Sequence, residues 1–403
     1  MSLFDVILIL VAFGSVALLL HPRLIHNRFW RAVVTPLASI IGSGFLVVAP
    51  LLYFSVGSYA LIAMAGIVLL AYTIGAAIRF NIQFVEPFLE QPSDPHLRWT
   101  KLIRELERFS NLILSFAYIV SVAFYLRLLA SFVFEGIGYK NELLENVLTT
   151  TVLLTIGIVG YLRGLQQLEF LEEYSVATKL GIIATLLLGL FFYDLHHPHF
   201  PMHTKAFSWT TLEILGGILL VVQGFETSKY LKGMYSIQER VQSMRAAQII
   251  SGIIYIVFVA LITPLLYHLH FQSVDETAII QLSRYASIVL PYLLILGAVM
   301  SQFSAAVADT IGSGGLLSVE THGTISFKTG YLMVALIGSA LVWSANIFEI
   351  ITYASRAFAL YYLLQVLIAM IFARYQKLSG RAIAFFVLAL ILLFIVIFGK
   401  PAG

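Results

Sequence analysis

Three ionisable side chains, Lys179, Glu226 and Asp309, lie inside segments of the chain that are otherwise apolar. A charge placed in lipid is costly, so an ionisable residue at such a position indicates a functional site. Removal from water favours the protonated form of a carboxyl, which can then load and release a proton. We therefore predict proton coupling at Glu226, Lys179 and Asp309. The alternatives are a hydrogen-bonded brace for Glu226 and a position in water at the mouth of a pathway for Asp309.

Two polar breaks interrupt apolar segments long enough to cross a bilayer. One is Ser39-Ile40-Ile41-Gly42-Ser43-Gly44, and the other is Gly224-Phe225-Glu226. Unpaired backbone groups at membrane depth are tolerated only where they face protein or a polar cavity. Amides freed at the start of a half-helix suit a carboxylate, and carbonyls freed in the second break suit an ammonium group.

The breaks predict a substrate site in which Phe225 closes over the bound molecule. Close packing of helices through small residues is the alternative interpretation of the first break. Tyr118 is a further aromatic side chain that suits the wall of such a site. The predicted substrate-binding residues are Ile41, Gly42, Ser43, Gly44, Tyr118, Val222, Gly224 and Phe225.

The composition explains why these residues stand out. Of the 403 residues, 60% are hydrophobic and 11% are charged, against roughly 25% charged in soluble domains. The apolar residues form about twelve segments of roughly 20 residues, the length that a bilayer core of about 30 Å requires. An all-α polytopic membrane protein with about 12 transmembrane helices follows. The absence of cysteine excludes disulfides, thiolate metal sites and cysteine nucleophiles.

The order of the segments predicts an internal repeat. If the first apolar segment is set aside, the breaks fall in the first and sixth of the remaining segments, which is typical of five-helix inverted repeats. The predicted organisation is an extra N-terminal helix and loop over 1–30, a first repeat (core helices 1–5) over 31–200, a second repeat (core helices 6–10) over 201–373, and a C-terminal helix over 374–403.

The distribution of lysine and arginine predicts the topology. Basic residues gather in alternate loops, which the positive-inside rule assigns to the cytoplasm. Both the N-terminus and the C-terminus are then expected outside. Two amphipathic stretches, 86–106 and 234–247, are expected to lie along the cytoplasmic face as separate connectors.

These motifs resemble the amino acid/polyamine/organocation (APC) superfamily of secondary transporters. Ile41-Gly42-Ser43-Gly44 looks like the first core helix of that family and Gly224-Phe225-Glu226 like the sixth. Weaker matches are Ala177-Thr178-Lys179-Leu180, similar to the fifth, and Ser301-Gln302-Phe303-Ser304-Ala305-Ala306, similar to the eighth. The glycines at 312, 314 and 315 depart from the usual eighth helix.

The resemblance implies the leucine-transporter fold of 5+5 inverted repeats and transport by alternating access in a bacterial-type inner membrane. It also implies that Lys179 replaces the sodium ion of sodium-coupled relatives, next to Ser304 and Ala305. A purely structural ammonium group, bonded to carbonyls of the first core helix, is the alternative for Lys179.

Two further groups of residues have less specific roles. Arg356 is a possible outer gate, and a pair with Glu349 is the alternative. Six histidines lie in two predicted outward loops, but no cysteine or carboxylate completes a ligand set, so no metal site is predicted. The six are His196, His197, His199, His203, His268 and His270.

The sequence therefore predicts a secondary active transporter of an amino acid or related small amine-bearing solute. We expect it to be proton-coupled and sodium-independent, with the solute and the lipid bilayer as its partners. No enzyme activity, cofactor or nucleic-acid partner is expected, and the absence of a phosphate-loop motif argues against a nucleotide-driven pump. A ligand-sensing receptor subunit of the same fold and an inorganic cation transporter are the alternatives.

Overall fold

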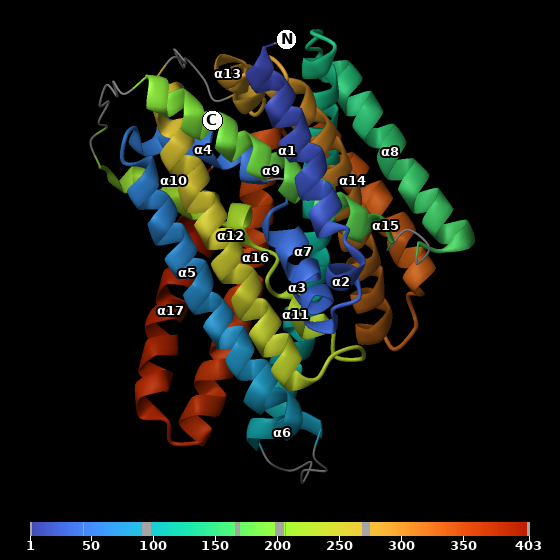
Figure 1. The fold of residues 1–403 in the computed structure, drawn as a ribbon. Helices are drawn as coiled ribbons and strands as arrows, with labels where there is room; N and C mark the ends of the chain where they lie inside the picture. The colour runs from blue at the N-terminus through green and yellow to red at the C-terminus, as the bar shows by residue number, and fades with distance from the viewer. Residues whose placement is uncertain are drawn as a thin grey trace.

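The computed structural model describes residues 2–42, 44–90, 98–165, 170–197, 205, 207–267 and 275–400, which form helices and no strand. The first half of the bundle (Figure 1) contains α1 (Leu3–Leu19), α2 (Pro22–Ile25), α3 (Arg28–Ile40), α4 (Gly44–Val56), α5 (Ala60–Phe80), the π-helix η1 (Asn81–Val85), α6 (Glu86–Glu90), α7 (Arg98–Gly136), α8 (Glu142–Arg163) and α9 (Phe170–His196). The second half contains α10 (Trp209–Gly217), the 3-10 helix η3 (Leu219–Val222), α11 (Thr227–Tyr230), α12 (Ile237–Leu266), α13 (Ala278–Ala286), α14 (Leu290–Glu320), α15 (Phe327–Ser344), α16 (Ile347–Tyr375) and α17 (Ser379–Phe398).

The number of membrane-spanning elements agrees with the sequence. Among the described residues, nine helices are long and apolar enough to cross a bilayer, and α3 with α4 forms a tenth span, bent by 43°. The apolar α1 and the interrupted segment α10–η3–α11 bring the candidate spans to twelve. The structure therefore confirms an all-α polytopic membrane protein.

The expected connector over 234–247 is wrong as a separate element, because α12 continues through it. Ser236 and Glu239 form a capping box that starts α12 at Ile237, and a capping box satisfies backbone donors that would otherwise be exposed at a helix start. Nothing then interrupts the helix as far as Leu266. In the same way, α7 begins at Arg98 and runs for 39 residues, about 58 Å at the α-helical rise.

Helix α7 is the centre of the bundle and packs against α14 and α16. The other elements surround this core: α17 packs on α16, and the extra helix α1 packs on α9. Gly181 of α9 permits the α1 contact, since a Cβ there would lie 2.7 Å from a Val16 methyl and 3.2 Å from the carbonyl oxygen of Ala12. This contact attaches α1 to the helix that carries Lys179.

The bundle has two ends, which we name by their chemistry. The start of α1 and the end of α17 lie at the same end, at the top of Figure 1, together with α13; we call it the terminal face. At the other end, the bottom of the view, lie α6 and the connection between α16 and α17. We call this end the basic face, because arginines and lysines gather in its connections, at 23–31, 98–108, 232–245 and 374–381.

Candidate functional site

The first break separates α3, which starts at the basic face, from α4, which ends at the terminal face. Helix α3 ends at Ile40, where the amide of Ile41 still donates to Leu37 (3.0 Å), and α4 starts at Gly44. The last carbonyls of a helix have no intrahelical partner. Two of them are met by other helices: Lys179 Nζ of α9 donates to the carbonyl of Ala38 (2.7 Å), and the hydroxyl of Tyr255 of α12 lies 2.9 Å from that of Ile40.

The second break separates α10 from α11 by the 3-10 turn η3 and three further residues. Its freed carbonyls are also met by side chains: Ser355 of α16 donates to Gly217 (2.7 Å), and the hydroxyl of Tyr255 lies 2.6 Å from the carbonyl of Val221. Tyr255 is fully buried and reaches a carbonyl of each break. Its single hydroxyl proton can serve only one of the two at a time.

Glycines bring the two breaks into direct contact. A Cβ at Gly44 would lie 2.7 Å from the Cα of Val221, and a Cβ at Gly224 would lie 2.6 Å from Ser39. Gly224 also has φ +118°, in the region that side chains rarely adopt. The structure thus brings together both glycine-containing breaks, as the sequence predicted.

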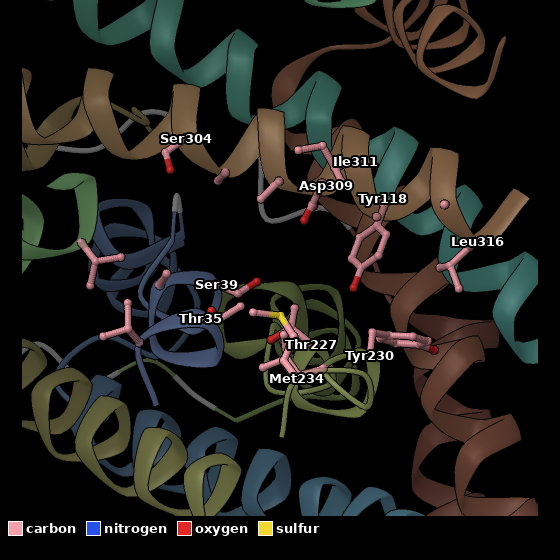
Figure 2. Close-up of a pocket in the computed structure, with 18 of the residues that line it drawn as sticks. Thr35, Ser39, Tyr118, Thr227, Tyr230, Met234, Ser304, Asp309, Ile311 and Leu316 are labelled. Atoms are coloured by element: carbon pink, nitrogen blue, oxygen red, sulfur yellow. The ribbon is translucent and has the colours of Figure 1, made fainter. Parts of the chain in front are cut away.

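A cavity of about 910 Å³ opens from the breaks toward the basic face. Its deep end contains Ser39, Lys179 and Ser301, and its mouth contains Arg31, near the start of α3, and Glu320, at the end of α14. Figure 2 shows Tyr118 and Asp309 on one side of this cavity, with Ser39 and Thr227 on the other. Helices α3, α7, α9, α11 and α14 therefore form its walls.

Three of the predicted residues line this cavity, namely Tyr118, Lys179 and Asp309. All three are largely buried from bulk water, at 4%, 7% and 5% exposure. A cation and a carboxyl in one cavity offer partners for both charges of a zwitterion. Lys179 donates to a carbonyl of α3, the contact expected of a replacement for sodium and equally of a structural ammonium group.

The other predicted substrate-binding residues lie behind the cavity wall. Gly42 lies in the first break and Gly44 starts α4. Val222, Gly224 and Phe225 pack in the second break, where the ring of Phe225 is stacked on that of Tyr362 (centroids 5.1 Å apart). Ile41 is fully buried, and Ser43 lies outside the described residues.

Glu226 is fully buried beside this stack. Its Oε2 atom accepts hydrogen bonds from the hydroxyl of Tyr362 (2.7 Å) and from the amide of Gly224 (2.9 Å). Its Oε1 atom has no hydrogen-bond partner among the described residues. Glu226 and Asp309 therefore occupy different places, with Asp309 on the cavity and Glu226 within the break.

Arg356 lies away from the cavity, on the side of α16 that faces α17. It donates to the carbonyls of Gly399 (2.9 Å) and Ile397 (3.2 Å) at the end of α17. Of the loop histidines, His196 and His197 have Nδ1 atoms within 3.0 Å of backbone carbonyls one turn earlier, and the other four lie outside the described residues. In the described part of the chain, no three His, Cys, Asp or Glu residues cluster as a metal site.

Sequence reasoning missed a buried polar network between α11 and the basic face. Lys229, at 6% exposure, pairs with Glu107 of α7 and donates to Gln365 of α16 (2.8 Å). Gln365 in turn receives a hydrogen bond from Asn81 of η1 (3.0 Å) and donates to Ser110 of α7 (2.8 Å). Amides such as Gln365 inside apolar segments were the signal that could have revealed this network.

Comparison with known proteins agrees with the geometry. A family model for APC superfamily transporters matches residues 22–399. A protein of Aquifex aeolicus (strain VF5), described as uncharacterized, is 54% identical over 381 residues, which cover 94% of this chain and 93% of the relative.

Solved structures share the fold at much lower identity. Two crystal structures of the manganese transporter of Eremococcus coleocola, one of a mutant and one in complex with an aromatic bis-isothiourea substituted compound, are each 12% identical to this chain. Each match covers 92% of this chain and 87% of the other, with TM-scores of 0.52 and 0.56, respectively. Together with the family match and the two broken helices around one cavity, this likeness leads to one assignment: the chain belongs to the APC superfamily of transporters.

Proposed function

We propose that this transporter moves an amino acid or a related small amine-bearing solute across the inner membrane by alternating access, coupled to protons and independent of sodium. The observation that carries the proposal is the cavity in which Lys179 and Asp309 lie beside the first break. The carboxyl of Asp309 suits the amine of a substrate. The ammonium group of Lys179 and the hydroxyl of Ser39, at the deep end of the cavity, suit its carboxylate.

The position of Lys179 supports sodium independence. Its ammonium group donates a hydrogen bond to the carbonyl of Ala38 near the end of α3. A cation bound there would lie against a like charge. Glu226 and Asp309 are the carboxyls that would exchange protons, one within the second break and one on the cavity.

The membrane topology is part of the same proposal. The basic face would be cytoplasmic, because lysine and arginine are enriched in cytoplasmic loops. The cavity would then be open to the cytoplasm, and both chain ends would lie outside. The proposal also includes the inverted repeat, with core helices over 31–200 and 201–373.

An inorganic cation is the weaker alternative. The fold likeness to a manganese transporter concerns a protein only 12% identical to this chain. In the described residues no carboxylate or histidine cluster of three or more offers the oxygen or nitrogen ligands of a divalent cation. Lys179 in the cavity wall also opposes a cationic cargo.

The test begins with ligand stabilisation of the purified protein by amino acids, amines and Mn²⁺. Uptake into proteoliposomes is then measured under a proton gradient or a sodium gradient. We expect an amino acid or amine to raise the unfolding temperature and to be taken up under the proton gradient alone. Stabilisation by Mn²⁺ only would favour the cation alternative, and binding without uptake would favour the receptor alternative.

Variants assign the roles of the ionisable residues. Glu226→Gln should abolish proton dependence while ligand binding remains, since Glu226 is not on the cavity. Asp309→Asn should weaken binding itself, because it removes a cavity-lining charge. Sodium-dependent uptake by the unmodified protein would contradict the role proposed for Lys179.

A further inference from the structure

A second, much smaller space lies on the other side of Lys179. It has a volume of about 30 Å³, and Lys179 lines both this space and the large cavity. Its other walls include Gly42 of the first break, Phe45 at the start of α4 and Gly297 of α14. We call this space the chamber; along α9 and α14 it lies nearer the terminal face than the cavity does.

Two buried polar side chains of α14 line the chamber, Ser301 and Gln302. They are 5% and 1% exposed, and neither Ser301 Oγ nor Gln302 Oε1 has a hydrogen-bond partner among the described residues. An unpaired buried polar atom costs about 1–3 kcal/mol, and native proteins rarely leave one without a partner. Two adjacent cases on one wall therefore indicate a ligand that supplies the missing hydrogen bonds.

The size and chemistry of the chamber identify that ligand. One water molecule needs roughly 10–15 Å³ of accessible space and two to four polar partners, which the chamber provides. Gln302 Oε1 accepts, Ser301 Oγ can do either, and the ammonium group of Lys179 donates. A metal ion is disfavoured by the like charge of Lys179.

We propose that the chamber binds an ordered water molecule that accepts a hydrogen bond from Lys179 and donates to Gln302, with Ser301 as its third partner. This water joins α9 to α14 on the side of Lys179 that faces away from the cavity. Lys179 then lies between two hydrated spaces, with Asp309, Arg31 and Glu320 as the other charged side chains that line the cavity. The amine of Lys179 would thus have water as a hydrogen-bond partner both in the chamber and in the cavity.

Thermal unfolding of the purified full-length chain tests for the water, because the proposal predicts whether Gln302→Leu lowers or raises the unfolding temperature. Gln302→Leu removes the acceptor and keeps the volume. If the chamber holds the water, this variant loses its hydrogen bonds and unfolds at a temperature a few degrees lower. If the chamber is dry, the variant removes an unpaired polar atom and unfolds at the same or a higher temperature, which overturns the proposal.

A double-variant cycle tests the bridge itself. Gln302→Leu and Lys179→Met should be less than additive, because either change removes the shared water. Ser301→Ala should show the same coupling to Lys179→Met. Ser304→Ala is the matched control, since Ser304 lies one turn away and lines the cavity but not the chamber. Additive effects of Gln302→Leu and Lys179→Met would overturn the bridge.

The consequence for transport rests on the proposed function. It can be contradicted while the proposal of the bound water still holds. If Lys179 takes part in proton coupling, Gln302→Leu should reduce proton-driven uptake several-fold more than Ser339→Ala of α15, which lines neither the cavity nor the chamber. Coupling in the unfolding cycle without this difference in uptake would keep the water and remove its role in transport. A structure at a resolution that shows ordered waters should have density between Lys179 Nζ and Gln302 Oε1, and its absence there would overturn the proposal directly.

Discussion

The two halves of each broken helix are held in different ways. Toward the terminal face, α4 is almost wholly buried and α10 is fixed by backbone contacts. Toward the basic face, α3 and α11 line an open cavity, and α11 has only four residues. The breaks thus divide a closed half of the bundle from an open half.

The closed half depends on a close approach of main chains. A Cβ at Gly217 of α10 would lie 2.1 Å from the carbonyl oxygen of Lys400. The amide of Lys400 donates to the carbonyl of Glu213 (2.9 Å), and its Nζ donates to the carboxylate of Glu213 (2.6 Å). Arg356 holds the carbonyls of residues 397 and 399 from α16. We call residues 397–400 the tail; with Arg356 it links α10 to α16 and α17.

The open half depends instead on side-chain pairs. Lys229 of α11 is held by Glu107 and Gln365, and Arg240 of α12 pairs with Glu86 (2.6 Å) and donates to the carbonyl of Lys229 (2.9 Å). Side-chain pairs can break and re-form as helices shift. Main chains that touch at a glycine have no such freedom, and they either remain in contact or move apart. We infer that the helices near the basic face can shift relative to one another. The helices near the terminal face can pack together in fewer ways.

Removal of Lys229 should break the open half with the largest effect. A helix of four residues cannot persist on its own hydrogen bonds, so α11 depends on this network. Lys229→Met leaves the carboxylate of Glu107 with its hydrogen bond from Gln365 but without a cation, and breaking a buried ion pair in this way costs on the order of 3 kcal/mol. Chemical unfolding in detergent measures the loss.

The matched control removes the charge on the partner as well. Lys229→Met combined with Glu107→Gln should recover part of the loss, because a neutral amide in place of the carboxylate leaves no unpaired charge. A Lys229→Met protein as stable as the unmodified chain would show that α11 does not depend on this network.

A side chain at Gly224 should separate the two halves at the break. Gly224→Ala introduces both a strained φ and a contact with Ser39, and overpacking of this kind costs about 1–3 kcal/mol. Uptake should fall further than stability does, because the breaks no longer meet. Gly66→Ala is the control: Gly66 lies inside α5, does not line the cavity and has no atom near its Cβ position, so alanine there should be neutral or stabilising. Equal effects of the two changes would contradict a special role for the contact.

The breaks show how far the sequence could predict this architecture. Gly42, Gly44 and Gly224 indicated interrupted spans because lipid penalises unpaired backbone groups, and the structure brings those interruptions together. Lys179 and Asp309 were found for the same reason, and both line the cavity. The cost of polar groups in lipid is strong enough to be visible in a single sequence.

Contacts between distant segments could not be predicted in that way. Tyr255 and Tyr362 support the breaks, but the chain has 20 tyrosines and nothing in the local pattern distinguishes these two. The contact of the tail with α10 depends on where α17 ends in space. The expected connector over 234–247 failed because an amphipathic stretch can either lie on a membrane or extend a spanning helix, and its pattern is the same in both.

Release of the tail should shift the balance between the two halves. Lys400→Ala removes an ion pair in which Lys400 is half exposed and Glu213 is buried, worth about 1 kcal/mol or less. If the tail holds the terminal face closed, the Lys400→Ala protein should open more often at the terminal face. Its cavity near the basic face should then be open less often than in the unmodified protein. A loss of 1 kcal/mol corresponds to about a fivefold change in an equilibrium.

Because the chain has no cysteine, the labelling rate of a single introduced thiol can report how often the cavity is open. Ala305→Cys introduces a single thiol in the wall of the cavity, and Lys400→Ala should slow its labelling by up to about fivefold. Lys328→Ala removes a charge near the basic face and leaves the tail unchanged, so it is the control. Unchanged labelling in the Lys400→Ala protein would show that the tail does not bias the two halves.

The smallest effect is expected for an ion pair that lies outside the spans, on the closed half. Lys140 donates to Asp275 (2.7 Å) between α7 and α13. Burial alone would raise the pKa of Asp275, but hydrogen bonds from Lys140 and Thr277 outweigh it, so the pKa falls below its ordinary value of 3.8. A lowered carboxyl pKa stabilises the fold above the ordinary value, and that contribution is lost as the pH falls through the lowered pKa.

Lys140→Met should therefore lower the unfolding free energy by less than about 1 kcal/mol, equally at pH 7 and pH 5. Below about pH 4, the difference between variant and unmodified protein should shrink, because the carboxylate itself becomes protonated. Unfolding curves of both proteins at pH 7, at pH 5 and below about pH 4 measure the difference in stability. A difference that grows on acidification would mean that the pair does not stabilise the closed half. Closure would then rest on the glycine contacts and the tail alone.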